Sequence, residues 1–251
     1  MNNDSTKFIA SCSGGKDSVA TLILAHEHNE PLDEVVYCEV MFDEETSGEH
    51  PEHLEFVLSK VKPFVEEVLE VPFVHLKSSK TYVDVFKRPI SRGENIGKPY
   101  GFAYPRMCAI NRDCKIPPIS QYWKSQDKNV IQYVGIAYDE QERLMSMHGT
   151  NRISLMNKYG ITENQATKIC VSRGLYSPCY DFSDRNGCCF CPNCKFNEWA
   201  NVIFKHEEMF DKLLKLERDY PNRARRCLTI NETPSELKRR ILFGGEQLSL
   251  L

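Results

Sequence analysis

Six consecutive residues near the amino terminus, Ser13-Gly14-Gly15-Lys16-Asp17-Ser18, have the composition of an anion-binding loop. Paired glycines let the backbone turn tightly and approach a ligand without an intervening Cβ. The two hydroxyls and the ammonium group add donors, and a helix that begins here would direct unpaired N–H groups at the same point. Asp17 is unexpected beside a phosphate unless it holds a magnesium ion or caps the helix. The segment is predicted to bind nucleotide phosphates, with Lys16, Asp17 and Ser18 as catalytic candidates.

Cysteines form the second group of residues that could do chemistry. The chain has eleven, and four of them lie in Cys188-Cys189-Phe190-Cys191-Pro192-Asn193-Cys194. Because the cytoplasm keeps thiols reduced, metal ligation or thiol chemistry is a better interpretation than disulfides. Two cysteines separated by two residues can grip one metal. One arrangement keeps the site local, as a four-thiolate zinc site of Cys179, Cys188, Cys191 and Cys194.

The elements that must position these groups follow from the apolar pattern, in which short apolar runs alternate with helical spacing. Such alternation predicts an open parallel sheet with helices on both faces, an α/β fold. The pattern changes beyond residue 160, so we expect a nucleotide-binding domain over residues 1–160 and a helical, cysteine-rich extension over 161–251. The predicted strands are 8–12, 34–42, 72–76 and 129–137, the predicted helices 19–26, 51–67, 116–124, 162–172 and 197–218, and a long loop is expected over 82–105.

Bulk properties limit the class of protein. Residues of the apolar types make up 41% of the 251 residues, and no apolar run approaches the ~20 residues of a membrane span. We expect a cytoplasmic protein without a membrane partner. A formal charge of −3 gives no global attraction for nucleic acid, but Arg223, Arg225 and Arg226, then Lys238 to Arg240, form local basic clusters. Nucleic acid therefore stays open as a partner.

The loop differs from the common P-loop, which requires four residues between its glycines. Its sequence, straight after the first strand, resembles the PP-loop of the adenine nucleotide alpha hydrolase-like superfamily, the PP-loop ATP pyrophosphatases. Within that superfamily the chain most resembles the phosphoadenosine phosphosulfate reductase-like branch. Residues 133–140 with Arg143 are similar to the branch's strand-end motif, and residues 106–119 are similar to its central Arg-Cys segment.

This resemblance implies cleavage of ATP between the α and β phosphates. The sulfonucleotide reductases of the branch carry a degenerate loop and a C-terminal Glu-Cys-Gly segment, whereas this chain keeps a full loop and reads Phe243-Gly244-Gly245-Glu246-Gln247 near its end. We therefore expect an adenylating enzyme that activates an acceptor, with sulfur transfer (thiolation) as the expected outcome. Two alternatives stay open, a sulfonucleotide reductase-like enzyme that uses an external thiol and a non-catalytic module that senses nucleotide or redox state.

A second metal arrangement follows from the same resemblance. It joins Cys108 and Cys114 of the central segment to Cys188 and Cys191, which is similar to the site of a 4Fe–4S cluster in adenylylsulfate reductases. We favour this split site, because the central segment otherwise has no reason to carry two cysteines beside the presumed active face. Zinc bound at the local site is the alternative.

The predicted mechanism places ATP across the carboxyl ends of the strands, where open α/β sheets bind ligands. The loop and Mg²⁺ neutralise the β and γ phosphates, so that pyrophosphate becomes a better leaving group. A nucleotide is the expected small-molecule ligand; the acceptor, a sulfur-donor protein and a second copy of the chain are left open as partners. Further candidates for contact with nucleotide, metal or acceptor are Asp43, Gly135, Asp139, Arg143, Arg106 and Lys115.

Overall fold

A single five-stranded parallel sheet forms the centre of the molecule. The computed structural model describes residues 6–105, 107–185 and 187–244. The strand order is β3-β2-β1-β4-β5, so the chain leaves β1 in one direction for β2 and β3 and returns to its other side for β4. This reversal places a crevice at the carboxyl ends of β1 and β4, where open α/β sheets bind ligands. The strands are β1 (Lys7–Ser11), β2 (Glu34–Glu39), β3 (Phe73–Lys77), β4 (Val130–Tyr133) and β5 (Arg152–Ile153).

Helices connect and cover the strands, as the sequence predicts. They are α1 (Lys16–Glu27), α2 (Pro51–Phe56), α3 (Tyr82–Lys87), α4 (Ile116–Lys124), α5 (Gln141–Met145), α6 (Leu155–Lys158), α7 (Glu163–Ser172), α8 (Phe196–Lys205), α9 (Glu207–Asp219) and α10 (Pro234–Phe243). Short π-helical turns at Val57–Val61 and Phe64–Val68 extend α2, another at Asn111–Lys115 precedes α4, and a 3₁₀ turn covers Pro178–Asp181.

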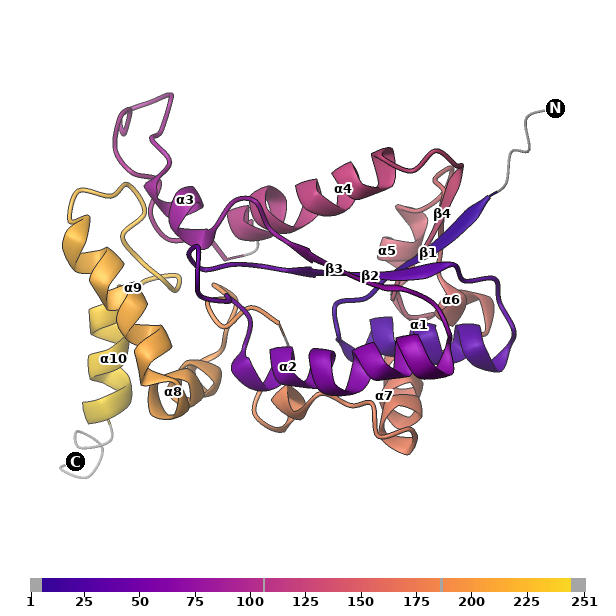
Figure 1. Cartoon of the computed structure of the whole chain (residues 1–251). Coiled ribbons are helices and arrows are strands. Elements are labelled where there is room, and N and C mark those ends of the chain that lie inside the picture. Colours follow the sequence, from indigo (N-terminus) through magenta and orange to yellow (C-terminus); the bar gives the residue numbers. More distant parts are fainter. Residues whose placement is uncertain (1–5, 106, 186, 245–251) are drawn as a thin grey trace.

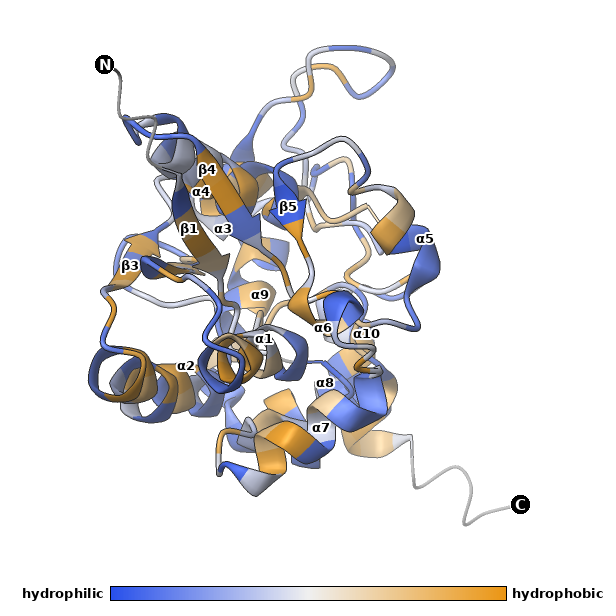
Figure 2. Cartoon of the chain, turned by 90° about the vertical axis from the view of Figure 1, so that its right-hand side faces the viewer, coloured by the Kyte–Doolittle hydropathy of each residue, from blue (hydrophilic) through white to orange (hydrophobic). Residues whose placement is uncertain are grey.

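The helices lie on both faces of the sheet (Figure 1). Helices α1, α2 and α7 cover one face and α4 covers the other. All six residues of β2 are buried, which explains why this strand reads as a continuous apolar run. Figure 2 shows hydrophobic residues along β1 and β4, with polar residues gathered on the connecting segments. The α/β fold with a parallel sheet is thus confirmed.

Two hydrophobic cores fill the molecule. The first joins the sheet to α1 and includes Ala166 and Cys170 of α7. The second core surrounds the fully buried Trp199 and Phe210. It packs α3 and residues 109–114, which precede α4, against the three helices α8, α9 and α10. The division of the chain near residue 160 stays a prediction, and α7, which lies beyond it, packs against α1.

Several elements differ from the sequence prediction. Helix α3 begins inside the predicted loop, because Thr81 and Asp84 form a capping box. The predicted helix over residues 197–218 is two helices, since His206 has the non-helical dihedrals φ −134° and ψ 51°. Strands β2 and β4 are shorter than predicted, and β5, α5, α6 and α10 were not predicted. No helix in the described ranges has both the length and the apolar character needed to cross a membrane.

Candidate nucleotide and thiol site

The phosphate loop (residues 13–18) connects β1 to the first turn of α1, which is the strand-loop-helix arrangement that the sequence predicts. Gly14 has φ +76°, and a Cβ there would lie 2.4 Å from Val57 Cγ2. The loop is closed by its own hydroxyls, because Ser13 N–H donates to Ser18 Oγ (3.2 Å) and Ser18 Oγ donates to Gly15 C=O (2.9 Å). Packing and hydrogen bonds thus fix the turn before any ligand binds.

Lys16 is held at the mouth of the loop by two carboxylates. Its Nζ lies 3.1 Å from Asp17 Oδ1 and 3.0 Å from Glu163 Oε1 at the start of α7. Burial opposes the charge of Lys16, but the hydrogen bonds with Glu163 and Asp17 outweigh it and raise its pKa. Burial raises the pKa of Asp17, and Lys16 counteracts this. Lys16 is therefore a fixed cation, and Asp17 is a carboxylate whose charge depends on a cation beside it.

Tyr180 occupies one of the donors that a phosphate would use. The Lys16 N–H, at the beginning of α1, donates to Tyr180 Oη at 3.0 Å. Burial of the phenol raises the pKa of Tyr180 to about 12, so it stays neutral. A neutral hydroxyl is a weaker partner for a helix N-terminus than a charged phosphate oxygen. Tyr180 can therefore be displaced from this donor by an anion.

A cavity of about 380 Å³ opens in front of the loop at the carboxyl ends of β1 and β4. The described residues that line it include Ser13, Gly15, Asp17 and Ser18 from the loop, together with Gly135, Arg143, Arg152 and Tyr180. Gly135 follows β4, and a Cβ there would lie 2.6 Å from Asp17 C and Ser18 N. The strand-end segment and the loop are brought together, as the sequence predicts.

Other candidates lie elsewhere. Asp139 Oδ1 accepts the Glu163 N–H at 3.1 Å, so its carboxylate supports the start of α7. Asp43 accepts from Thr46 N–H and pairs with Lys212 at 3.1 Å, in a separate cavity. Asp43 lies apart from the loop because it is four residues beyond the end of β2, away from the edge of the sheet where the strands end. Asp43 is therefore not brought to the loop.

Lys115 does lie near the loop, since its charge influences the pKa values of Cys12, Glu49 and His53. Arg106 lies outside the described residues.

His53 connects the loop to the cysteine-rich part of the chain. Its Nε2 lies 2.9 Å from the Ser13 carbonyl oxygen, which only accepts, and its Nδ1 lies 3.1 Å from Ser177 Oγ. The proton is therefore on Nε2, and Nδ1 accepts from the serine hydroxyl. Burial lowers the pKa of His53 to about 4. The ring is neutral near pH 7 and holds the loop backbone in position.

A second cavity, of about 330 Å³, joins the loop to the cysteines. Lys16 and Asp17 line one side of it, and Cys188, Cys191 and Cys194 line another. His50, Glu163, Tyr180 and Arg185 are also among its lining residues. A nucleotide bound at the loop would therefore share one solvent-filled space with three thiols.

Four of the candidate ligands interact electrostatically: Cys108 influences the pKa of Cys188, and Cys191 influences those of Cys108, Cys188 and Cys194. The thiol of Cys194 donates a hydrogen bond to Cys191, which lowers the pKa of Cys191 to about 6 and raises that of Cys194. Burial raises the pKa of Cys188.

Two other candidates have different surroundings. The fully buried Cys114 thiol donates to the Thr81 carbonyl oxygen at 3.6 Å. Cys179 is also fully buried, beside Ser177.

The chemistry of these thiols fits zinc or an iron–sulfur cluster, both of which take thiolate ligands. Within residues 6–105, 107–185 and 187–244, however, no three His, Cys, Asp or Glu side chains converge as a ready-made metal site. Electrostatic interactions connect Cys108, Cys188, Cys191 and Cys194, and Cys108 also acts on the buried Cys114. The ligand set stays a proposal.

Sequence reasoning missed Glu49 and His50, which lie between β2 and α2. Glu49 pairs with Cys188 in an isolated β-bridge, and its carboxyl is buried, which raises its pKa. Its Oε2 and His50 Nδ1 are buried and make no hydrogen bond with the described residues. Burial lowers the pKa of His50 to about 4. The available signal was their place beyond the carboxyl end of a strand, where ligands bind in such sheets.

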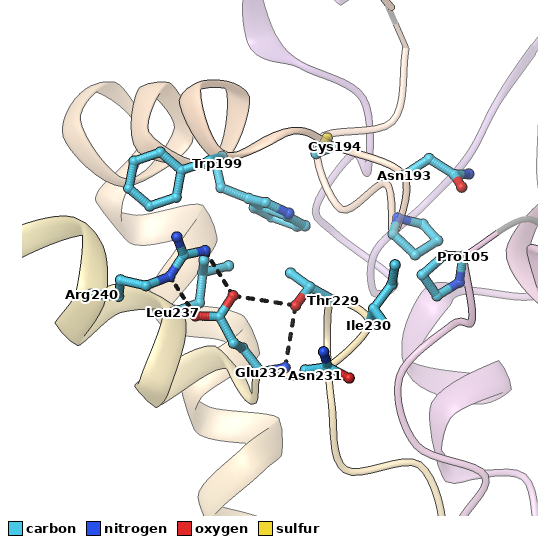
Figure 3. Close-up of a pocket in the computed structure, with 12 residues that line it drawn as sticks. Pro105, Asn193, Cys194, Trp199, Thr229, Ile230, Asn231, Glu232, Leu237 and Arg240 are labelled. Carbon is cyan, nitrogen blue, oxygen red and sulfur yellow. Dashed lines mark hydrogen bonds and ion pairs between the residues drawn. The ribbon is translucent and has the colours of Figure 1, made fainter. Parts of the chain in front are cut away.

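Cys194 also borders a larger cavity, of about 480 Å³ (Figure 3). Figure 3 shows Cys194 at the top, Trp199 and Leu237 on the left, and Ile230 and Pro105 on the right. The Arg240 guanidinium pairs with Glu232 and lies 4.3 Å from the centroid of the Phe196 ring. Cys194 thus borders both this mostly apolar cavity and the cavity of about 330 Å³ that joins the loop to the cysteines.

No family model matches the chain, and no curated protein matches it either. Among solved structures, the chain is similar to the U34-tRNA thiolase NcsA from Methanococcus maripaludis with its [4Fe-4S] cluster. The match covers 98% of this chain and 73% of that chain, at 16% identity and a TM-score of 0.42. A likeness at this level carries no argument about function, which must come from the site itself.

The site places Ser-Gly-Gly-Lys-Asp-Ser between the first strand and its helix, at the reversal point of the sheet. Residues 13–18, which resemble a PP-loop and are called the PP-loop below, thus lie where the sequence predicts. From here on, the cavity in front of this PP-loop (residues 13–18) is called the nucleotide cavity, and the one shared with the thiols is called the thiol cavity.

Proposed function

We propose that the protein is an ATP-dependent adenylating enzyme that transfers sulfur to an acceptor. The observation that carries the proposal is the thiol cavity, in which Lys16 and Asp17 of the PP-loop face Cys188, Cys191 and Cys194. Three thiols in the space beside the loop support chemistry that combines a nucleotide with thiols or a thiolate-bound metal.

ATP binds with its β and γ phosphates against the backbone N–H groups that begin α1. The fixed charge of Lys16 neutralises the leaving pyrophosphate, while Tyr180 yields the Lys16 N–H to a phosphate oxygen. Asp17, whose pKa burial raises, would hold Mg²⁺, which would supply further neutralisation of the phosphates. An acceptor carbonyl oxygen attacks the α phosphorus, and the bond to pyrophosphate breaks.

Sulfur then arrives from the opposite wall of the thiol cavity. Sulfide held near Cys191 attacks the activated carbon, AMP leaves with the original oxygen, and a carbon–sulfur bond replaces the carbon–oxygen bond. Cys108, Cys188, Cys191 and Cys194 would hold a cluster or zinc ion at this wall, and an iron–sulfur cluster would supply a binding position for the sulfide. The cavity of about 480 Å³ beyond Cys194 gives the acceptor a route of entry.

The test is an anaerobic preparation that is analysed for iron, sulfide and zinc and assayed for pyrophosphate release with MgATP and sulfide across candidate acceptors. We expect AMP and pyrophosphate in equal amounts and a thiolated product. Lys16→Gln removes the fixed charge and should slow pyrophosphate release at least about tenfold, because a charge-assisted hydrogen bond is worth ~1.5–3 kcal/mol.

Glu163→Gln is the matched control, since it removes one of the two carboxylate partners of Lys16 and keeps the ammonium group for phosphate. Its pyrophosphate release should equal or exceed that of the wild type. The proposal is wrong if ADP and phosphate are the products, or if sulfonucleotides are reduced by an added thiol without any ATP cleavage.

A further inference from the structure

A basic arm projects from the molecule between α3 and α4 (Figure 1). It is an extended hairpin in which Pro89 pairs with Pro99, Ile90 N–H donates to the Lys98 carbonyl, and Tyr100 N–H donates to the Arg88 carbonyl. Residues 224–225, between α9 and α10, lie alongside its base. We define the arm surface as residues 87–104, Arg112 and Arg225–Arg226.

Backbone hydrogen bonds fix the two segments against each other. Ala224 N–H donates to the Pro99 carbonyl at 2.8 Å, Arg225 N–H to the Tyr100 carbonyl at 3.0 Å, and Phe102 N–H to the Arg225 carbonyl at 3.2 Å. These contacts join residues more than a hundred positions apart in the sequence. The base of the arm surface is therefore a built feature of the fold.

Arginine and tyrosine side chains alternate on this base. The Arg88 and Arg225 guanidinium groups each lie 4.8 Å from the centroid of the Tyr100 ring, and Arg225 also lies 4.9 Å from that of Tyr104. Tyr104 is 49% exposed, which leaves ring surface open to solvent. Stacked arginine and tyrosine with an exposed ring form the kind of platform on which unpaired bases stack.

The arm surface is positively charged, whereas the whole chain has a net negative charge. Its described residues include the cations Lys87, Arg88, Arg92, Lys98, Arg112, Arg225 and Arg226. Three carboxylates accompany these seven cations over residues 84–113, namely Asp84 in the first turn of α3, Glu94 and Asp113. Arg112 and Arg88 share Asp113, whose pKa these arginines, Arg112 foremost, hold down at about 2. The surface is thus strongly positive on a chain of net charge −3.

The arm surface leads directly to the proposed reaction site. Tyr104 is followed by Pro105, which lines the cavity of about 480 Å³ together with Cys194. Tyr104 also pairs with Met107 in an isolated bridge, one residue before Cys108. A chain of phosphates bound along the arm would place a neighbouring group at the mouth of this cavity.

We propose that the arm surface binds a single-stranded polynucleotide, with phosphates along its cations and one base stacked on Tyr104. For its role as the acceptor in sulfur transfer, this inference rests on the proposed function. A single strand fits because bases must be unpaired to stack on a side chain. The aromatic platform distinguishes this partner from an acidic peptide, for which the cations alone would suffice.

The experiment measures fluorescence anisotropy of labelled oligonucleotides of about twelve residues, RNA and DNA of one sequence, bound to the full chain without ATP. Arg92→Glu/Arg226→Glu should weaken binding about tenfold or more and flatten its salt dependence. The matched control is Lys60→Glu/Lys168→Glu, which changes net charge equally. All four side chains are exposed, and none forms an ion pair with a described residue. The control should bind within about twofold of the wild type.

Tyr104 tests the stacking step separately. Tyr104→Ala should weaken binding about tenfold, and Tyr104→Phe, which keeps the ring, should restore it. Tighter binding of RNA than of DNA identifies RNA as the source of the strand, and the reverse identifies DNA. The inference is overturned if neither oligonucleotide binds, if the two double variants bind equally, or if polyglutamate competes as well as nucleic acid.

These outcomes are separable from those of the proposed function. Pyrophosphate release with a small acceptor, without oligonucleotide binding, overturns the arm assignment alone. Oligonucleotide binding that depends on Arg92, Arg226 and Tyr104, without cleavage of ATP, overturns the proposed function alone.

Discussion

At the scale of single residues, the site depends on side chains that hold the PP-loop as much as on those that would touch phosphate. His53 donates to the Ser13 carbonyl and accepts from Ser177, so one imidazole links the loop to the segment that leads to the cysteines. Tyr180 Oη accepts a hydrogen bond from the Lys16 N–H, and the Glu163 carboxylate pairs with the Lys16 ammonium group. None of these contacts follows from local sequence, because each joins residues far apart in the chain.

His53 predicts a specific pH dependence of stability. Its pKa in the folded chain is about 4, below the ordinary value of 6.5, so folding favours the neutral ring. This contribution is fully present above pH 6.5 and is lost as the pH falls toward 4, by up to roughly 3 kcal/mol. His50, whose pKa is also about 4, adds to the loss in the same window. The measurement is the free energy of unfolding in urea between pH 4 and pH 7.5.

His53→Gln isolates the effect, because an amide keeps a donor for the Ser13 carbonyl and does not titrate. The variant should show a shallower loss of stability over this window than the wild type, while the part due to His50 remains. Parallel curves for the two proteins would show that protonation of His53 is not linked to folding.

At the scale of elements, the reversal of the strand order at β1 and β4 creates the nucleotide cavity, and the tight turn after β1 shapes it. Residues before the turn are buried β-strand and residues after it are helix, which the apolar pattern alone predicts. The break at His206 and the capping boxes that start α3 and α10 were missed. The caps have a sequence signal, since Thr81 and Asp84, and Thr233 and Glu236, have the spacing of a capping box.

The positive φ and the close packing of Gly14 predict that the turn tolerates no side chain at this position. Gly14→Ala would force an alanine to φ +76° and place its Cβ 2.4 Å from Val57 and 2.7 Å from His53. Gly97→Ala is the matched control, because Gly97 has φ +79° but nothing within 4 Å of its Cβ position. Both changes carry the backbone cost of about 1–2 kcal/mol. Gly14→Ala should lose a further ~1–3 kcal/mol of unfolding free energy through overpacking.

Urea unfolding measures both variants, and calorimetry with MgATP measures their nucleotide binding. We expect Gly97→Ala to bind nucleotide as the wild type does and Gly14→Ala to bind it weakly. Equal stabilities for the two variants would mean that the packing of Val57 and His53 does not constrain the turn.

At the scale of the whole molecule, two cores meet where the PP-loop faces the cysteines. The sequence predicted the α/β fold and the place of the loop, because periodicity and glycine chemistry are local. It did not predict how the cysteines group. The thiol of Cys114, a predicted ligand, donates to the Thr81 carbonyl, and Cys194, the alternate ligand, interacts with Cys191. Which four cysteines bind a metal stays a prediction. Such grouping is decided by packing between distant segments, which one sequence does not reveal.

The second core is what places the arm surface beside the cavity at Cys194, because Phe102, Trp199 and Leu237 all belong to it. The sequence showed the arginines near residue 225 only as a local basic cluster, with nucleic acid open as a partner. The backbone hydrogen bonds between residues 99–102 and 224–225 place the Arg225 guanidinium over the rings of Tyr100 and Tyr104. The functional meaning of these arginines is therefore a property of the folded chain.

A crystal structure of the protein with Mg²⁺ and an ATP analogue that resists cleavage between the α and β phosphates tests the central claim most directly. We expect phosphate density against residues 13–18, with the Lys16 N–H turned from Tyr180 to a phosphate oxygen. The α phosphate should face the space shared with Cys188, Cys191 and Cys194. Nucleotide density in another cleft, with the loop still closed on Tyr180, would contradict the account.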